Sequence, residues 1–525
     1  MSTSPALRAH PLTTITVALF AALLMIGLVA YKDYGISWDE LPTREFGLMN
    51  VSHAVSDVRT LDSLRAVSGP AYERFGPLFE IVLVRAELAF TRNDPRATML
   101  LRHLLTFLTY FAGVVLFHLF CLRRFTQGIA LLATACLVAS PPLFSHAFYN
   151  TKDISFLAAF VAAMLSLDVM LSNPSTRAVL VHALATLVLL GMRILGLFAV
   201  MLTAAAAFAR RPTRRTVLQL ALYGALVLVL LPLVWPVLRI DPIGVVKGAV
   251  IGSTSNPYTK TDLFRGRMIP ANDLPRDYAT TWMLVTTPMV ITALFFVGVG
   301  RAVVSLLRQP REHLFGERQR DVIVLCWFFA PVLGTVVLRP VMYDAWRHLF
   351  FVYPALIYLA AIGMEGAVAY AIARLGEARR RAIHVAGTVA LALCLAPAVA
   401  FMVANHPFEH LYFNRLAGRD MAQVKQRFEL DYWGLSYRQL LEHIVRTDTS
   451  PVIRIRVANY PGLVNSLMLE PRDQMRIRYV RGDDEADYFV TNYRFHPEPY
   501  PYPREVFSVR VGNASVASVF RLRNP

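Results

Sequence analysis

Cysteine and charged residues are scarce in this sequence. Its 525 residues contain 4 cysteines and 36 Asp+Glu against 53 Lys+Arg, and only 17% of all residues are charged. Soluble domains carry about 25% charged residues, so the composition argues against a chain of soluble domains and against disorder. The cysteines are too few for a disulfide-rich secreted fold. All of them fall within apolar stretches and show no metal-binding spacing: Cys121, Cys136, Cys326 and Cys394.

Long apolar stretches are what the sequence has instead. It is 55% hydrophobic, and its mean hydropathy is +0.45. A helix of about 20 apolar residues crosses the hydrocarbon core of a bilayer. We therefore predict a mainly α, polytopic membrane protein with about eleven transmembrane helices, near residues 12–31, 99–121, 127–144, 154–171, 178–192, 194–209, 216–238, 283–304, 321–338, 349–372 and 383–403. The number of spans within 178–209 stays open, and we interpret 12–31 as a retained anchor.

The formal charge of +17 indicates either nucleic-acid binding or the excess of basic residues that membrane proteins carry on their cytoplasmic side. The positions of the arginines decide between these two explanations. Basic clusters occupy alternate connections between the apolar stretches, near residues 123–124, 177, 210–215, 308–320 and 374–381. By the positive-inside rule these connections are cytoplasmic. We expect a multi-pass protein of the inner (plasma) membrane with a cytoplasmic N-terminus and no nucleic-acid partner.

The opposite, extracytoplasmic (periplasmic) side then receives the large non-helical parts. A first external loop spans residues 32–98, and its apolar segment 78–90 suits an interfacial or re-entrant helix. The tail combines a helix near 434–446 with alternating strand patterns such as Ile453–Val457. We predict two domains, a transmembrane domain over 1–403 and a small external α/β domain over 404–525.

Acidic residues at the outer ends of the spans are the first candidates for chemistry. Asp39 and Glu40 follow the first span, where two carboxylates suit a general base or a cation ligand. The alternative is an acidic loop that starts a helix. Lys152 and Asp153 follow Asn150, a pattern that also suits ordinary helix capping. Together, acids and a lysine on one face suit proton abstraction and phosphate neutralisation.

Cations at the same side suit the binding of a lipid phosphate. Arg347 and His348 are adjacent in a short external turn whose aromatic residues are also typical of interfacial anchors. Arg74 precedes Gly76 and Pro77 and adds a weaker candidate. Arg193, among apolar residues, is either functional or the snorkelling end of a helix.

The sequence contains no Gly-rich phosphate loop of the P-loop type. An extracytoplasmic enzyme has no supply of nucleotide sugars, so it needs a lipid-linked donor. A transporter suits the pattern less well, because transporters place their charged residues near the membrane midplane.

Several segments in this order resemble the GT-C superfamily of glycosyltransferases. The closer resemblance is to glycosyltransferase family 39, the protein O-mannosyltransferases and lipid A aminoarabinose transferases. The segments that carry the resemblance are Gly35–Glu40, Asn150–Asp153, Trp346–Phe350 with Tyr353 and Pro354, Tyr412–Asn414 and Phe428–Gly434. The resemblance covers the membrane region and the start of the tail, and it implies a GT-C-like arrangement of the membrane helices.

The resemblance also implies an activity, the transfer of a sugar from a polyprenyl-phosphate carrier to an acceptor on the outer face. Asp39 matches the family's first-loop acid, a general base or acceptor-orienting residue with Glu40 as partner, and Asp153 matches the second-loop acid. Arg347 matches the residue that meets the donor phosphate, with His348, Lys152, Arg74 and Arg193 as further candidates. The segment Arg74–Leu78 stands where aminoarabinose transferases have a Lys-Pro-Pro-type motif, which weakens a lipid A acceptor. A protein acceptor is weakened by the lack of an insertion between late spans.

Several alternatives stay open at this point. The acceptor is a glycan, a lipid or a protein, and a divalent cation on Asp39, Glu40 and Asp153 is undecided. Tyr432 and Trp433 suit either sugar stacking or buried packing. The rival to an enzyme is a non-catalytic transporter or scaffold for lipid-linked glycans. If Asp39, Asp153 and Arg347 lay more than about 15 Å apart, the catalytic interpretation would fail, because one substrate could not contact all of them.

Overall fold

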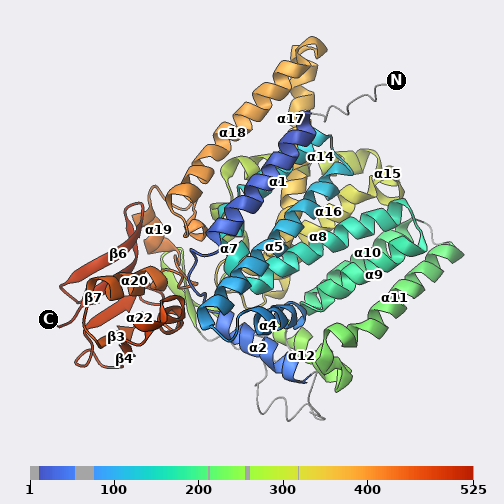
Figure 1. Ribbon diagram of the computed structural model, residues 1–525. Helices are drawn as coiled ribbons and strands as arrows, with labels where there is room; N and C mark the ends of the chain where they lie inside the picture. Colours follow the sequence, from blue (N-terminus) through green and yellow to red (C-terminus); the bar gives the residue numbers. More distant parts are fainter. Residues whose placement is uncertain (1–10, 54–75, 211–212, 255–259, 317, 524–525) are drawn as a thin grey trace, which may run out of the picture.

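The structure is a computed structural model that describes residues 11–53, 76–210, 213–254, 260–316 and 318–523 (Figure 1). Within these residues, eight helices are long and apolar enough to cross a membrane, so the chain is a multi-pass membrane protein. They are α1 (Pro11–Ala30), α5 (Pro95–Leu122), α8 (Thr151–Ser172), α11 (Arg214–Val234), α14 (Met289–Arg308), α16 (Gln319–Leu338), α17 (Tyr353–Leu375, preceded by the 3₁₀ turn Arg347–Val352) and α18 (Arg380–Ala404).

The apolar stretch 127–144 is a broken helix rather than the single straight span predicted from the sequence. It forms α6 (Gln127–Val138) and α7 (Pro141–Tyr149), which meet at an angle of 65°. The two prolines at 141 and 142 lack the N–H groups that a continuous helix needs, which explains the break after Val138. All of α7 is buried, and its end leads directly into α8.

The stretch 178–209 forms two short apolar helices, α9 (Thr176–Leu190) and α10 (Leu197–Ala209), joined through the 3₁₀ turn Ile194–Gly196. The break contains Gly191, whose carbonyl accepts the N–H of Leu78 at 2.9 Å. With α6 and α7 taken as one span, the described residues hold nine candidate spans and these two shorter helices. Each predicted stretch thus contains apolar helix, while the total of eleven stays a prediction.

Helices α2 (Glu40–His53), α4 (Leu78–Phe90) and α12 (Pro242–Thr254) occupy loops at the lower end of the bundle in Figure 1. The 13-residue helix α4 carries two acids, Glu80 and Glu87, that are buried rather than exposed. Arg102 of α5 lies 2.5 Å from Glu80 and 3.7 Å from Glu87. Ion pairs therefore fix this helix against the bundle.

The C-terminal part contains a five-stranded sheet with the order β4-β3-β5-β7-β6, which confirms the predicted small α/β unit. Strands β4, β3 and β5 are parallel, and β7 is antiparallel to both of its neighbours. The strands are β3 (Ile453–Val457), β4 (Ile477–Tyr479), β5 (Tyr488–Thr491), β6 (Glu505–Val511) and β7 (Ala514–Arg521), and helices α19 (Met421–Arg427), α20 (Tyr437–Thr447), α21 (Pro461–Val464) and α22 (Pro471–Gln474) accompany them.

A hairpin of β1 (Thr261–Phe264) and β2 (Arg267–Pro270), followed by α13 (Tyr278–Thr286), ties this part to the bundle. Phe264 forms a β-bridge with Phe428, just after α19. The sheet therefore lies at one end of the bundle, beside the loops that follow α1 and α7 (Figure 1).

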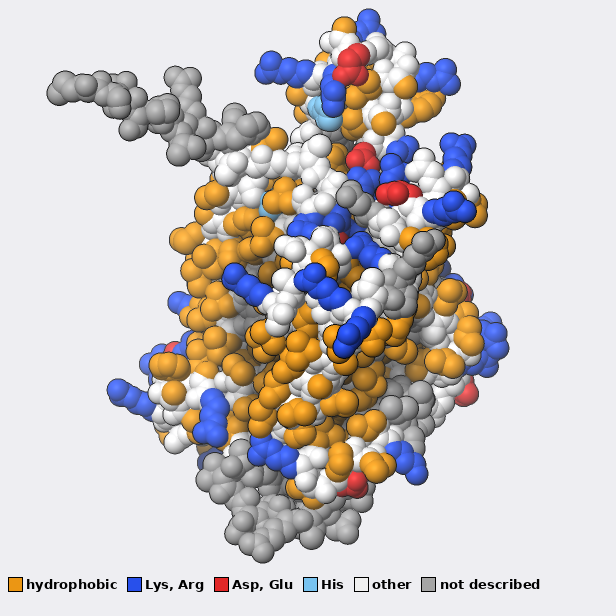
Figure 2. Space-filling model, turned by 90° about the vertical axis from the view of Figure 1, so that its right-hand side faces the viewer, with side chains coloured by type: hydrophobic (Ala, Val, Ile, Leu, Met, Phe, Trp, Pro, Cys, Tyr) orange, Lys and Arg blue, Asp and Glu red, His pale blue; other side chains and the backbone are white. Residues whose placement is uncertain are grey.

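The surface of the bundle fits a membrane environment. On the face in Figure 2, hydrophobic side chains cover a broad area, while basic side chains gather above it and at its edges. Exposed apolar residues such as Leu228 and Val229 of α11 are 73% and 74% accessible, and such a large exposed apolar area is typical of a lipid-facing surface. The short helix α15 (Pro310–Phe315) lies in an arginine-rich connection at the end of the bundle away from the sheet.

Candidate functional site

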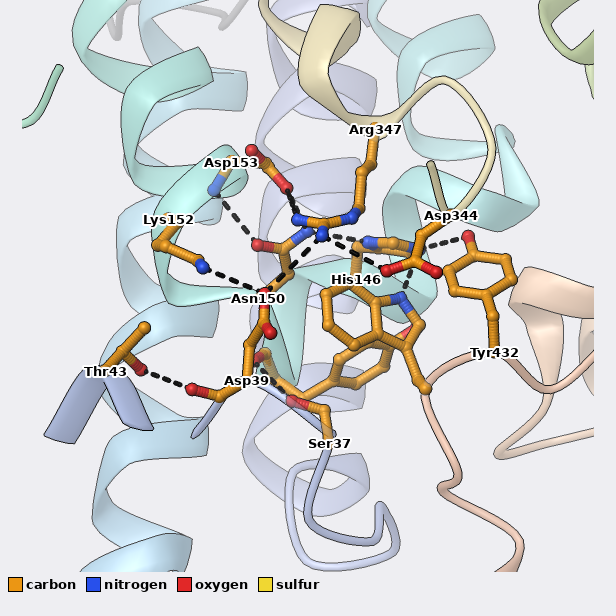
Figure 3. A network of polar contacts seen from close by, with 12 residues as sticks. Ser37, Asp39, Thr43, His146, Asn150, Lys152, Asp153, Asp344, Arg347 and Tyr432 are labelled. Carbon is orange, nitrogen blue, oxygen red and sulfur yellow. Dashed lines mark hydrogen bonds and ion pairs between the residues drawn. The ribbon is translucent and has the colours of Figure 1, made fainter. Parts of the chain in front are cut away.

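Charged side chains from four separate segments meet at the end of the bundle that faces the C-terminal sheet (Figure 3). Asp39 comes from the loop after α1, and Lys152 and Asp153 come from the first turn of α8. Arg193 lies in the break between α9 and α10, and Arg347 begins the 3₁₀ turn before α17. The ion pairs described below join all five, and together they are called the outer cluster.

Asp39 lies between two cations. Its carboxylate is 2.9 Å from the ammonium of Lys152 and 3.6 Å from the guanidinium of Arg347, and its side chain is 27% exposed. Burial alone would raise the pKa of Asp39, but Lys152 and Arg347 outweigh that effect and lower the pKa to about 2. Asp39 is therefore ionised and open to solvent on one side.

Asp153 is held by both helix capping and ion pairing. Asn150 is the N-cap of α8, and its side chain accepts the N–H of Asp153 and donates to the Asp153 carboxylate at 2.8 Å. The same carboxylate lies 2.7 Å from Arg193 and 3.3 Å from Arg347. The capping interpretation and the functional interpretation of this segment thus describe one arrangement, because the cap orients the acid.

Arg347 is the centre of the cluster and is only 1% exposed. Besides Asp39 and Asp153 it contacts Asp344 at 3.2 Å, and its guanidinium packs 4.8 Å from the centre of the Trp433 ring. Its buried Nε–H has no hydrogen-bond partner in the described part of the chain. A fully buried guanidinium with a spare donor is suited to an anionic ligand.

The remaining predicted residues form no ion pair with the cluster in the described part of the chain. The carboxylate of Glu40 accepts the N–H of Ser37 at 2.6 Å and lies 2.8 Å from Nε2 of His103, so it is engaged away from the partners of Asp39. His348 packs edge-on against Tyr343, with 4.9 Å between the ring centres. It forms no ion pair among the described residues, but Arg347, Asp153, Arg193 and Lys152 lie close enough to act on its charge. Arg74 lies outside the described residues.

The acids of the site do not form a metal centre in the part of the chain that the structure describes. No group of three or more His, Cys, Asp or Glu side chains converges there. Asp39 and Asp153 already face cations, and Glu40 faces His103. These contacts do not test the divalent cation that the sequence left open.

The C-terminal part supplies two residues to the site, Arg494, which the sequence did not reveal, and Trp433, for which it left sugar stacking or buried packing open. Arg494 lies 2.5 Å from Asp344, which in turn contacts Arg347. The indole N–H of Trp433 donates to Nε2 of His146 on α7 at 3.2 Å, and Trp433 is 1% exposed, so it packs inside the site. No local pattern marks Arg494, since its partner lies 150 residues away along the chain.

A cavity of about 130 Å³ adjoins the cluster. Lys152 and Arg193 line its polar side, and Pro42, Phe46 and Phe79 from α2 and α4 line its apolar side. The cavity thus joins two cations to aromatic walls next to the membrane-spanning helices, a combination typical of ligand pockets.

Solved structures share the fold of this chain, although no protein-family model and no curated protein matches it. The apo structure of ArnT from Cupriavidus metallidurans aligns with a TM-score of 0.51 at 14% identity, over 98% of this chain and 99% of that one. The apo oligosaccharyltransferase of Archaeoglobus fulgidus aligns with a TM-score of 0.50 at 10% identity, over 92% and 66% of the two chains. At these identities the likeness is one of fold. The chain therefore shares the membrane fold of these two proteins, which agrees with the fold that the resemblance to GT-C glycosyltransferases implied.

Proposed function

We propose that this chain is a membrane glycosyltransferase that moves a sugar from a polyprenyl-phosphate donor to an acceptor hydroxyl at the outer membrane face. The observation that carries the proposal is the outer cluster. Lys152, Arg193 and Arg347 converge on Asp39 and Asp153 beside a cavity at the membrane surface. Cations suit a phosphate leaving group, and a carboxylate suits the acceptance of a proton.

The fold supports the same class of reaction. Of the two solved structures compared above, one is an oligosaccharyltransferase and the other is ArnT. Arg347 contacts both Asp39 and Asp153, so the three residues lie well within about 15 Å of one another and a substrate beside the exposed side of Asp39 lies close to the charges of all three. A non-catalytic scaffold has no need of this convergence.

The proposed reaction is a single inverting displacement. The acceptor oxygen forms a bond to the anomeric carbon as the bond between that carbon and the phosphate oxygen breaks. The phosphate leaves with the electron pair, and Asp39 takes the proton of the acceptor hydroxyl. Arg347 and Lys152 stabilise the charge that develops on the leaving phosphate, and Arg193 extends this cationic wall.

Donor binding would also prepare the base. With Lys152 and Arg347 beside it, Asp39 has a pKa of about 2 and is a weak base. A bound phosphate competes for the same two cations. Weaker pairing raises the pKa of Asp39, because less positive charge then favours its ionised form. The donor thus makes Asp39 more basic at the moment when the acceptor must lose its proton.

The finer assignments belong to the same proposal. We assign the chain to family 39, with a cytoplasmic N-terminus, a C-terminal domain from about residue 404 on the outer face of the inner membrane, and a glycan, lipid or protein acceptor. The arginine-rich connections lie at the opposite end of the bundle from the outer cluster, which fits the positive-inside rule (Figure 1).

Replacement of the proposed base tests this function. Purified Asp39→Asn is assayed for transfer from a synthetic polyprenyl-phosphate sugar, with Glu45→Gln as the matched control, because Glu45 is an exposed acid on the adjacent helix α2. Loss of a positioned base lowers turnover by about 10²–10⁴-fold. Near-normal turnover of Asp39→Asn would remove Asp39 from the mechanism, and no transfer by the unmodified chain would favour the transporter or scaffold.

A further inference from the structure

Two cations outside the donor cavity meet at Trp38, the residue immediately before Asp39. The ammonium of Lys260 lies 4.4 Å from the centre of the Trp38 ring, and the guanidinium of Arg494 lies 4.7 Å from it. Both cations also lie on the ring of Phe495, at 5.0 and 4.7 Å. Cations favour the faces of aromatic rings, so three distant segments of the chain build one rim beside Asp39.

The two cations of this rim differ in their charge partners. Arg494 is buried and lies 2.5 Å from the carboxylate of Asp344. Lys260 is exposed, and no carboxylate of the described residues forms an ion pair with it. Burial and the neighbouring Arg494 lower the pKa of Lys260, although Asp344 opposes them. A bound anion would relieve this repulsion, because it supplies the missing negative charge.

The backbone holds Lys260 in place at the rim. Its carbonyl accepts the N–H of Ala271 at 3.1 Å, at the base of the β1–β2 hairpin. Two residues later Asp262 is buried, accepts the hydroxyl of Tyr278 at 2.5 Å and accepts the N–H of Asp344 at 3.1 Å. Lys260 therefore projects from a hairpin that is anchored to the loop before Arg347.

The loop on the other side of Trp38 is strained. Tyr493 and Phe495 have φ angles of 58° and 63°, a left-handed conformation that bulky residues rarely adopt. Such strain costs roughly 1–3 kcal/mol for each residue and clusters at functional sites. In this strained loop, Phe495 lies beside Trp38 and Arg494 contacts Asp344.

We propose that Lys260 binds an anionic group of the acceptor, a carboxylate or a phosphate, next to the hydroxyl that reacts at Asp39. The inference rests on the proposed function and names the class of acceptor, a hydroxyl compound that also carries a negative charge. The donor cavity is lined by other cations, Lys152 and Arg193, whereas Lys260 is exposed at the rim. Lys260 forms and breaks no covalent bond. Its proposed role is to select acceptors that carry a negative charge.

Binding to the full-length chain in nanodiscs tests the proposal without the need for turnover. The probes are a galacturonate tetrasaccharide, a phosphomannose tetrasaccharide and the neutral maltotetraose. We expect the unmodified chain to bind one acidic probe at least tenfold more tightly than the neutral probe, and Lys260→Gln to lose that preference. Lys260→Arg should retain it, and so should the control Lys247→Gln, which alters an exposed lysine on α12.

Undecaprenyl phosphate, measured with the same variants, separates an acceptor site from a donor site. We expect Lys260→Gln to bind this lipid as tightly as the unmodified chain does. Equal loss of undecaprenyl phosphate binding would assign Lys260 to the donor and overturn the proposal. Equal binding of acidic and neutral probes by the unmodified chain would also overturn it. Failure of the proposed function has a different signature, namely no sugar transfer while the acidic preference persists.

Discussion

Ion pairs gather at both ends of the helix bundle, and their charge balance differs. At the end away from the sheet, an inner cluster joins three arginines to three carboxylates: Arg123, Arg124, Arg320, Asp168, Asp321 and Glu365. The outer cluster, extended by the pair of Asp344 and Arg494, joins four cations to three carboxylates: Lys152, Arg193, Arg347, Arg494, Asp39, Asp153 and Asp344. Counted over these ion-paired side chains alone, the inner charges cancel and the outer charges leave one positive charge over.

The two clusters also differ in whether their buried polar atoms have hydrogen-bond partners. In the inner cluster, Asp168 pairs with both Arg123 and Arg320, and no buried polar atom of these six residues lacks a partner within the described chain. In the outer cluster, the Nε–H of Arg347 is buried without one. A balanced cluster holds helix ends together. A cluster with a surplus positive charge, a spare hydrogen-bond donor and an adjoining cavity is suited to binding an anion.

The largest expected effect is a loss of turnover when Arg494, the cation that the C-terminal part contributes beside the outer cluster, is replaced. Arg494→Ala leaves Asp344 with Arg347 as its main cation, which draws Arg347 away from Asp39. Because displacement of a catalytic group by about 1 Å costs up to 10²-fold, we expect turnover to fall by about 10–100-fold. Transfer assays measure it, with exposed Arg446→Ala as control.

Arg494→Lys restores the charge and should recover part of the turnover, which mere unfolding would not allow. The same reasoning predicts that removal of residues 404–525 abolishes transfer. A chain that lacks them and still transfers sugar would show that this region only binds glycans.

An intermediate effect is expected at the inner cluster, on stability alone. Asp168→Asn removes a carboxylate that accepts hydrogen bonds from two arginines. Hydrogen bonds to charged groups contribute about 1.5–3 kcal/mol, so we expect a loss of roughly 2 kcal/mol in the free energy of unfolding. Turnover per folded molecule should stay within about twofold. Denaturant unfolding measures the stability and a transfer assay on the same sample measures the turnover. A loss of turnover without a loss of stability would contradict a purely structural role for the inner cluster.

An effect of similar size, again on stability alone, is expected in the pH dependence of Asp39. Folding lowers its pKa from the ordinary value to about 2. A lowered folded-state pKa contributes stability above the ordinary pKa of about 4, and this contribution is lost as the pH falls through about 2. The difference in unfolding free energy between the unmodified chain and Asp39→Asn should therefore shrink between pH 4 and pH 2. A difference independent of pH in that window would contradict the ion pairing of Asp39.

Local signals in the sequence explain which parts of the site were predictable. Asn150 caps a helix and thereby orients Asp153, and the apolar surroundings of Arg193 marked it as either functional or snorkelling. The structure places Arg193 on Asp153 with 11% of its side chain exposed. These residues were recognisable because each lies at the end of an apolar stretch.

Other features depend on contacts that no local pattern encodes. Glu40 and Asp39 are adjacent, yet only Asp39 reaches the cluster, because α2 begins at Glu40 and turns its carboxylate to Ser37 and His103. The pairing of Arg494 with Asp344 joins segments 150 residues apart. The break between α6 and α7 did have a signal, the prolines at 141 and 142, which the apolar run concealed.

The central claim is that the surplus cations of the outer cluster bind a lipid-linked phosphate, and Lys152 tests it most directly. Lys152 is 19% exposed and lines the cavity, so its replacement leaves the buried Arg347 in place. Binding of undecaprenyl phosphate to Lys152→Gln is compared with binding to Arg124→Gln, a variant of the inner cluster. We predict that affinity for undecaprenyl phosphate falls about tenfold or more in Lys152→Gln and is unchanged in Arg124→Gln. Equal affinity of both variants and the unmodified chain would contradict it.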